Sequence, residues 1–157
     1  MKSLDEQLSI YQQHHTNKTN RLTHYVGIPF IVFSLMMLFN WVSIDIAAKW
    51  QISFSWILIC ATLIYYFLLN IRLAMAATVI FIVMTVIATL VAGSTPTVSS
   101  AVIFIVLFVG GWILQFVGHL FEKQKPAFLF SKTQLLIGPL FVLVEALSAM
   151  GVAKYFI

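Results

Sequence analysis

Charged residues are scarce in this 157-residue sequence: Asp, Glu, Lys and Arg together make up 9% of it, whereas 61% is hydrophobic. The mean hydropathy of +1.00 lies far above that of soluble globular domains. This composition excludes an ordinary soluble enzyme and predicts a protein with several membrane-spanning helices.

Cysteine is almost absent, because Cys60 is the only one, and this excludes an intramolecular disulfide. Its position in an apolar run favours a small buried side chain. The N-terminal stretch lacks a basic region followed by an apolar one, so we expect no cleavable signal peptide. The net charge of +4 comes from basic residues at the ends of apolar runs, which fits lipid headgroups better than nucleic acid. We therefore expect membrane lipid, and no nucleic acid, as a partner.

The sequence contains four to five apolar runs. Each is long enough to cross a bilayer core of about 30 Å as a helix. The runs are 25–44, 52–71, 73–92 and 101–121, with a fifth at 135–153 that either spans the membrane or re-enters it. Residues 4–15 are predicted to form a short helix at the membrane interface. The predicted fold class is all-α, a polytopic membrane bundle of four to five transmembrane helices with a short N-terminal interfacial helix, in a single domain over residues 1–157.

The basic residues divide unequally if five spans alternate. One side receives seven of them and the other receives two, which predicts that the first side is cytoplasmic. The richer side carries Lys2, Lys18, Arg21, Arg72, Lys123, Lys125 and Lys132, and the other carries Lys49 and Lys154. This arrangement places all four histidines on the cytoplasmic face of an integral membrane protein, in either a bacterial inner membrane or the endoplasmic reticulum.

The histidines fall in two polar clusters, His14, His15 and His24 near the N-terminus and His119 at the end of the fourth apolar run. Neutral imidazoles bind transition metals, and lipid-facing helices avoid them. On one unbroken helix His15 and His24 would point to opposite faces, because they are nine residues apart. The polar segment 16–20 therefore predicts a turn, with the next helix capped near Asn20, that lets the two imidazoles converge.

The second cluster is a stripe along one helix face, because Gln115, His119 and Glu122 lie at positions i, i+4 and i+7. A His-x-x-Glu pair on one face can offer nitrogen and oxygen to the same ion. Together the two clusters predict a metal centre at one membrane surface. The predicted metal ligands are His15, His24, His119 and Glu122, which are also the predicted catalytic residues, with His14 as a further candidate ligand.

Glu145 lies inside the fifth apolar run, about 9 Å along a helix that would begin at Pro139. An unpaired carboxylate at that depth is costly. We expect Glu145 to be either protonated or hydrogen-bonded locally, or to orient a ligand or meet the metal.

The spacing of these polar residues resembles a known family. The matching motifs are Tyr11-x-x-x-His15, Asn20-x-x-x-His24, Gln115-x-x-x-His119-x-x-Glu122, Lys125-Pro126-Ala127, and Gly138-Pro139 ahead of Glu145. They are similar to those of the small membrane 2-hydroxy fatty acid dioxygenases, which carry out α-oxidation in phytosphingosine breakdown. The resemblance covers nearly the whole chain, and its specificity lies in the two polar clusters.

The resemblance implies Fe(2+) as cofactor, O2 and a long-chain 2-hydroxy fatty acid as substrates, and loss of one carbon from the acid. It implies an alkyl tail held between the helices or in lipid, and a homo-oligomer is compatible with it. The candidate substrate-binding residues are Arg21, Gln115 and Lys125, and the candidate supporting residues are Tyr11, Asn20 and Glu145.

Three other functions stay open at this stage. A membrane zinc hydrolase acting on a lipid amide or ester is one, since three histidines and a water also suit zinc. A transporter with histidines and Glu145 as proton relays is another, although the histidines lie at one surface and no inverted repeat is evident. The third is a non-catalytic membrane scaffold.

Overall fold

The computed structural model describes residues 2–47, 50–129 and 131–157, and the described chain is mostly helical, as predicted. The α-helices are α1 (Leu4–Gln13), α2 (Lys18–Asn40), α3 (Phe54–Leu69), α4 (Ile71–Ala92), α5 (Val98–Glu122) and α6 (Thr133–Ala149). The other elements are the strands β1 (Ser43–Ala47) and β2 (Trp50–Ser53) and the short 3-10 helices η1 (Ala127–Leu129) and η2 (Ala153–Tyr155).

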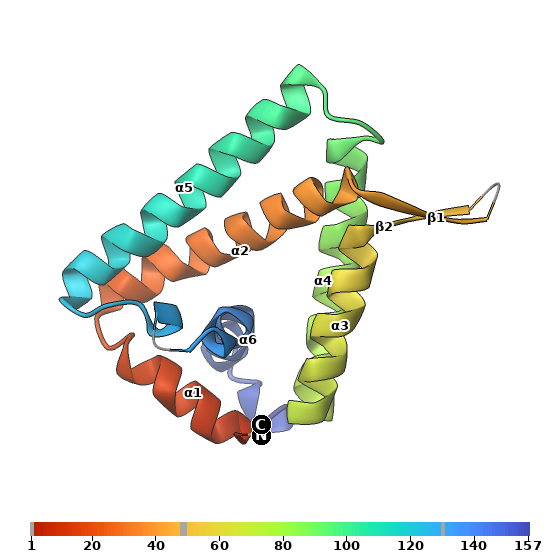
Figure 1. Cartoon of the computed structure of the whole chain (residues 1–157). Coiled ribbons are helices and arrows are strands. Elements are labelled where there is room, and N and C mark those ends of the chain that lie inside the picture. The colour runs from red at the N-terminus through yellow and green to blue at the C-terminus, as the bar shows by residue number, and fades with distance from the viewer. Residues whose placement is uncertain (1, 48–49, 130) are drawn as a thin grey trace.

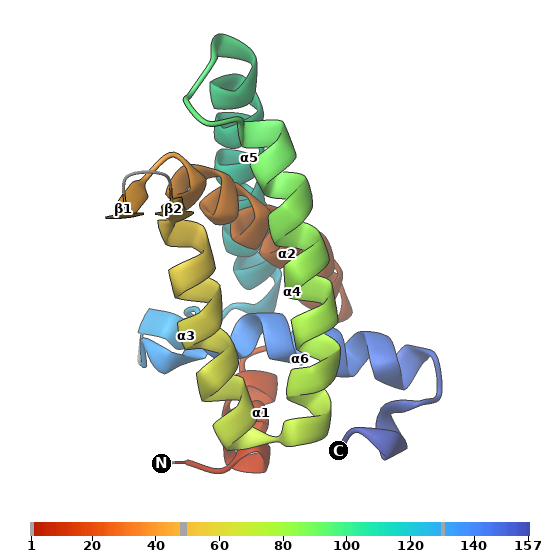
Figure 2. The same cartoon turned by 90° about the vertical axis from the view of Figure 1, so that its right-hand side faces the viewer.

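Three of these helices, α2, α4 and α5, are long and apolar enough to cross a membrane, whereas α3 and α6 are apolar but shorter. Figure 1 shows α2 and α5 side by side, with the first turns of α2 next to the last turns of α5. The hairpin of α3 and α4 packs at the other end of α2. In Figure 2, α6 runs across the α3–α4 pair. The first turns of α2 are therefore enclosed by α5, α1 and α6.

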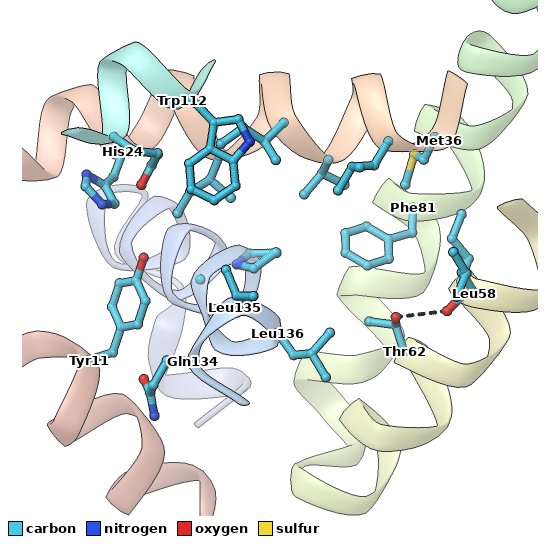
Figure 3. Close-up of a pocket in the computed structure, with 18 of the residues that line it drawn as sticks. Tyr11, His24, Met36, Leu58, Thr62, Phe81, Trp112, Gln134, Leu135 and Leu136 are labelled. Atoms are coloured by element: carbon cyan, nitrogen blue, oxygen red, sulfur yellow. Dashed lines mark hydrogen bonds between the residues drawn. The ribbon is translucent and has the colours of Figure 1, made fainter. Parts of the chain in front are cut away.

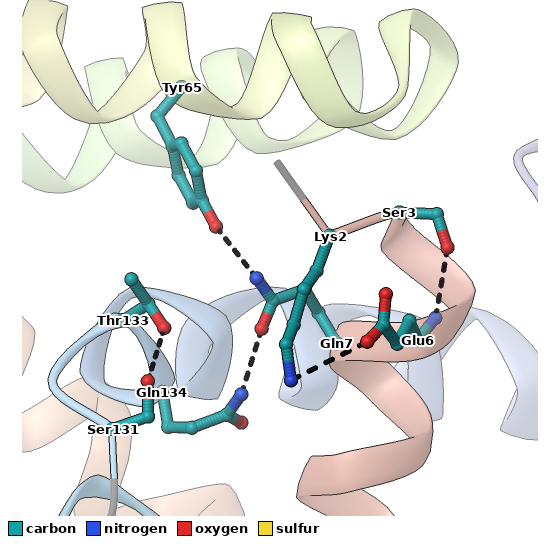
Figure 4. Close-up of polar contacts among 8 residues, drawn as sticks. All are labelled: Lys2, Ser3, Glu6, Gln7, Tyr65, Ser131, Thr133 and Gln134. Atoms are coloured by element: carbon teal, nitrogen blue, oxygen red, sulfur yellow. Dashed lines mark hydrogen bonds and ion pairs between the residues drawn. The ribbon is translucent and has the colours of Figure 1, made fainter.

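Polar contacts tie the two short helices α1 and α6 to this frame. The Gln134 side-chain nitrogen donates to Gln7 Oε1 at 2.9 Å, and Gln7 Nε2 donates to the Tyr65 hydroxyl at 3.5 Å (Figure 4). The Tyr66 hydroxyl donates to the carbonyl oxygen of Leu136 at 2.5 Å. Since Gln7 and Gln134 are almost fully buried, these hydrogen bonds hold α1, α3 and α6 in one arrangement.

Glycines set the close contact between α2 and α5. A Cβ atom on Gly111 would lie 2.9 Å from the carbonyl oxygen of Gly27 and 2.7 Å from Ile31 Cγ1. A Cβ atom on Gly118 would lie 2.4 Å from Asn20 Oδ1. Small residues allow two helix backbones to approach in this way. The glycines thereby fix the register that places the polar end of α5 against the polar start of α2.

Alanine substitution at two adjacent glycines of α5 should therefore change the stability of the protein differently. Gly111→Ala is expected to destabilise the protein by about 1–3 kcal/mol, because the new methyl group meets backbone atoms. Gly110→Ala is the matched control, since nothing lies within 4 Å of its added Cβ, and it should be neutral or stabilising by up to about 1 kcal/mol. Denaturant unfolding of the purified protein in detergent measures both, and equal stabilities would contradict this account of the helix contact.

Several predicted boundaries are wrong. The helix predicted to be capped near Asn20 begins at Lys18, because the Asn17 side chain caps it by accepting from the backbone N–H groups of Thr19 and Asn20. The cap is therefore Asn17 and not Asn20. The helix predicted over 4–15 ends at Gln13. The last helix begins at Thr133 and continues through Pro139, which places Glu145 about 18 Å from its start in place of the predicted 9 Å.

Residues 43–44 and 52–53 were assigned to the ends of two apolar runs, but they lie in the strands β1 and β2, which pair antiparallel with Ile44 opposite Ile52. Alternating polar and β-branched residues suit a strand better than a helix end. Lys49, which entered the charge count, lies outside the described residues. Cys60 was expected to be buried, yet it is exposed, because in a membrane protein an apolar side chain can face lipid.

Candidate metal centre

Three histidines from three segments meet beside the first turns of α2. His15 comes from the turn between α1 and α2, His24 from α2 and His119 from α5, and all three are buried. Their ring centroids are separated by 4.4 Å for His15 and His24, and by 5.0 Å from each of these to His119. One ligand nitrogen from each ring lies within 4.8 Å of the others. This spacing allows the three nitrogens to converge on one ion.

Backbone carbonyls orient two of the three rings. His15 Nδ1–H donates to the carbonyl oxygen of Tyr11 at 2.6 Å, and His24 Nδ1–H donates to that of Asn20 at 2.8 Å. A hydrogen bond of this kind at one ring nitrogen fixes the tautomer and leaves the other nitrogen to ligate. Local helical turns therefore present both Nε2 atoms to the centre of the cluster.

Two ring nitrogens in the cluster are buried without a hydrogen-bond partner among the described residues, His15 Nε2 and His119 Nδ1. A buried polar atom left in this state costs about 1–3 kcal/mol. A bound metal ion would satisfy both nitrogens at once. The donor set thus fits a transition metal that prefers imidazole.

The environment of His15 favours its ligating form. The pKa of His15 is lowered to about 4, mainly because the side chain is buried. Its imidazole is therefore neutral at pH 7. The Tyr11 ring stacks on the His15 ring with centroids 4.1 Å apart, and burial raises the pKa of the Tyr11 hydroxyl, which stays protonated. Tyr11, predicted as a supporting residue, thus holds His15 by both its ring and its carbonyl oxygen.

Glu122 binds the turn that carries His15. Its Oε1 accepts from the backbone N–H and the hydroxyl of Thr16 at 2.9 and 2.5 Å, and its Oε2 accepts from the Asn17 N–H at 2.8 Å and Asn20 Nδ2 at 3.0 Å. With both oxygens engaged, Glu122 lies outside the group of converging ligand atoms found among the described residues. The structure therefore places this carboxylate next to the histidines as a clasp between α5 and the turn.

Asn20 connects the clasp to the histidines. Its Nδ2 donates to the carbonyl oxygen of His14 at 3.1 Å as well as to Glu122, and its own carbonyl oxygen accepts from His24. Its side chain is fully buried. His14 lies in the same turn, half-buried, but it is not one of the three converging histidines.

The remaining predicted site residues lie to one side of the histidine cluster. Arg21 forms an ion pair with Glu145, and the Tyr25 hydroxyl donates to the same carboxylate oxygen at 2.7 Å. Glu145 is therefore hydrogen-bonded, but the expectation that its partners would be local is wrong, because both come from α2. Lys125 is exposed in the segment after α5. Neither Arg21 nor Lys125 lines the cavity described next.

A cavity of about 340 Å³ opens beside the three histidines. His15, His24 and His119 line it together with Tyr11 and Gln115. Figure 3 shows His24 and Tyr11 at one side of the cavity. Gln115 Nε2 is buried and has no hydrogen-bond partner among the described residues. Most of the remaining lining is aliphatic or aromatic. The cavity has the size and character of a site for an organic ligand with one polar end.

Two comparisons with known proteins agree with the resemblance seen in the sequence. The family described as "2-hydroxy-palmitic acid dioxygenase Mpo1-like" matches residues 1–150. The chain is 32% identical over 154 residues to the 2-hydroxy-palmitic acid dioxygenase MPO1 of Saccharomyces cerevisiae. The aligned region covers 94% of this chain and 82% of the yeast protein. The chain belongs to the Mpo1-like family. No solved structure matches it.

Sequence reasoning missed part of the site of this Mpo1-like protein. The apolar cavity residues, such as Phe81 of α4, carry no motif and resemble any other residue of a membrane helix. Gln134 lines the cavity and is 2% exposed, and its position just before an apolar run could have drawn attention to it. The polar residues of a membrane helix are the ones whose pattern indicates a function.

Proposed function

We propose that this Mpo1-like protein is a membrane dioxygenase that uses Fe(2+) and O2 to shorten long-chain 2-hydroxy fatty acids by one carbon. The observation that carries the proposal is the buried cluster of three histidines at the polar end of an apolar cavity. The name of the yeast relative supports the substrate class. Imidazole ligands with open coordination positions suit non-haem iron that activates oxygen.

In this proposal His15, His24 and His119 hold the metal. When bound, Fe(2+) would supply open coordination positions and the one-electron chemistry that activates O2, while the electrons that reduce O2 come from the 2-hydroxy acid. The residues around it hold and orient the substrate: Gln115 offers an amide N–H to the acid, and the Tyr11 hydroxyl offers a second donor. Gln115 takes this role in preference to Arg21 and Lys125, because it lines the cavity and they do not.

In this proposed arrangement the metal neutralises the negative charge of the substrate carboxylate. Among the described residues that line the cavity there is no Asp, Glu, Lys or Arg. A carboxylate that enters such an apolar space pays a large desolvation cost unless a cation meets it. We therefore propose that the acid end of the substrate binds next to the histidines, with its alkyl tail in the apolar part of the cavity.

We also propose that α3 and α6 cross or enter the membrane with α2, α4 and α5, and that the metal centre lies on the cytoplasmic side. The 16 residues of α3 extend for about 24 Å, which is most of a bilayer core of about 30 Å. Arg72 at the junction of α3 and α4 and the basic residues near the end of α5 support this orientation.

Oxygen uptake with a defined metal tests the function. Protein purified without oxygen and loaded with Fe(2+) is expected to consume O2 when 2-hydroxypalmitate is added, and to release an acid one carbon shorter. The same protein loaded with Zn(2+) should consume none. The plain fatty acid of equal length is the matched control, since it lacks the hydroxyl group, and it should cause no oxygen uptake with either metal.

A zinc hydrolase remains the second candidate, because three histidine nitrogens without a carboxylate are also a catalytic zinc set. Protein that retains zinc on purification, consumes no oxygen and hydrolyses a lipid amide or ester would replace the dioxygenase proposal with this one.

A further inference from the structure

We infer that the cavity also measures the length of the substrate's alkyl tail, and that Phe81 is the stop at the end remote from the histidines. This inference rests on the proposed function, because it takes the ligand to be a long-chain acid whose acid end lies at the histidine cluster.

The cavity follows one face of α2 over most of its length. His24, Ile28, Leu35 and Phe39 all line it, and their spacing of four or seven residues places them on the same side of the helix. The sixteen residues from His24 to Phe39 are separated by fifteen helical steps, which correspond to about 22 Å along the helix axis. Half of a bilayer core of about 30 Å is the depth filled by one lipid acyl chain. The lined face is therefore long enough for a full acyl chain.

The imidazoles of the described residues that line this path lie at one end of it, and the α3 hydroxyls of Ser55 and Thr62 also line it. Figure 3 shows His24 and Tyr11 on one side of the cavity, and Met36, Phe81, Leu58 and Thr62 on the opposite side. The Thr62 hydroxyl donates to the carbonyl oxygen of Leu58 at 2.9 Å and is thereby satisfied within its own helix. An alkyl chain that starts at the histidines would thus meet mostly apolar side chains, with Ser55 Oγ as a buried hydroxyl that has no hydrogen-bond partner among the described residues.

Phe81 is held in place by its contact with Tyr66, which lines the same cavity. It is 7% exposed, and its ring centroid lies 5.9 Å from that of Tyr66, which is 1% exposed. The Tyr66 hydroxyl in turn donates to the Leu136 carbonyl oxygen of α6. Because this contact restrains the Phe81 ring, the ring cannot simply move aside for a longer tail.

Chain-length profiles of Phe81 variants test the inference. Phe81→Ala should move the best-bound length to longer acids, with about fourfold tighter binding for each methylene that newly fits. Leu35→Phe, which fills the path between the two ends, should move it to shorter acids. Phe67→Ala is the matched control, because it removes the same atoms from α3 at a side chain that is 41% exposed and outside the cavity, and it should leave the profile unchanged.

Binding should be measured by displacement of a fluorescent fatty acid from Zn(2+)-loaded protein in lipid nanodiscs, because the cation meets the acid end and no turnover is expected, with a series of saturated acids of increasing length. Phe81→Leu serves as a second variant that keeps an apolar side chain, and a smaller shift in the same direction is expected. Identical profiles for Phe81→Ala, Leu35→Phe and the wild type would overturn the inference and place the tail in surrounding lipid.

The same data separate this inference from the proposed function. A shifted binding profile in a protein that never consumes oxygen would support the tail site and reject the dioxygenase. Oxygen uptake with an unshifted profile in every cavity variant would retain the dioxygenase and reject Phe81 as the stop.

Discussion

Replacement of His24 by alanine is expected to abolish both metal binding and oxygen uptake. His24 supplies one of three converging nitrogens, and its ring is preset by the hydrogen bond to the Asn20 carbonyl oxygen. Loss of a group that only supports a ligand weakens metal binding by about 10–100-fold, so loss of a ligand itself should exceed that range. Metal content by elemental analysis and oxygen uptake with 2-hydroxypalmitate measure the two effects, and His15→Ala and His119→Ala should behave alike.

His14→Ala is the control for this series. It removes an imidazole one residue from His15, and its side chain is not one of the three that converge. This variant should keep its metal and most of its activity, because the contact of residue 14 with Asn20 is made by the backbone carbonyl oxygen. Full metal content in His24→Ala, or loss of metal only in His14→Ala, would reject the three-histidine centre. A circular dichroism spectrum like that of the wild type would exclude unfolding as the cause of a loss.

The role of the polar residues could be predicted from the sequence, because a membrane helix tolerates few polar side chains. His15 and His24 required a break between them, and the segment 16–20 supplied residues that favour turns, so their approach followed from helix geometry. The structure brings both to His119. Gln115 was expected on the same stripe as His119, and both line the cavity.

The partners of the carboxylates could not be predicted in the same way. Glu122 lies on the same helix face as His119, which suggested a shared ion, but its oxygens bind a turn that is more than a hundred residues away in the chain. Glu145 likewise meets Arg21 and Tyr25 across the interface of two helices. Periodicity fixes the side of a helix on which a residue lies, whereas the neighbour on that side depends on packing.

Helix packing also explains why the cavity was not foreseen. Its walls come from all six α-helices, and no single apolar run differs from those that face lipid. The close approach of α2 and α5 at Gly27 and Gly111, with α6 held by Tyr66, decides where the walls meet and where space remains. Such space is a property of the assembled bundle and has no local sequence pattern.

Glu122→Gln is expected to weaken metal binding by about 10–100-fold while three histidine nitrogens remain at the metal. The amide keeps one acceptor oxygen but loses the negative charge and the second acceptor, so it cannot satisfy the donors of Thr16, Asn17 and Asn20 together. The turn that carries His15 should loosen as a result. Metal titration gives the affinity, and X-ray absorption at the metal edge gives the number of nitrogen ligands.

Thr16→Val is the matched variant on the other side of this contact, because it removes the hydroxyl that donates to Glu122 at 2.5 Å and leaves the carboxylate in place. If Glu122 acts through the turn, Thr16→Val should weaken metal binding in the same direction and by a smaller factor. If Glu122 is itself a ligand, Thr16→Val should leave the affinity unchanged, while Glu122→Gln should replace the oxygen neighbour seen at the metal edge of the wild-type protein. That second pattern would contradict the role of Glu122 as a clasp, because a carboxylate bound to the metal cannot also use both oxygens to hold residues 16–20.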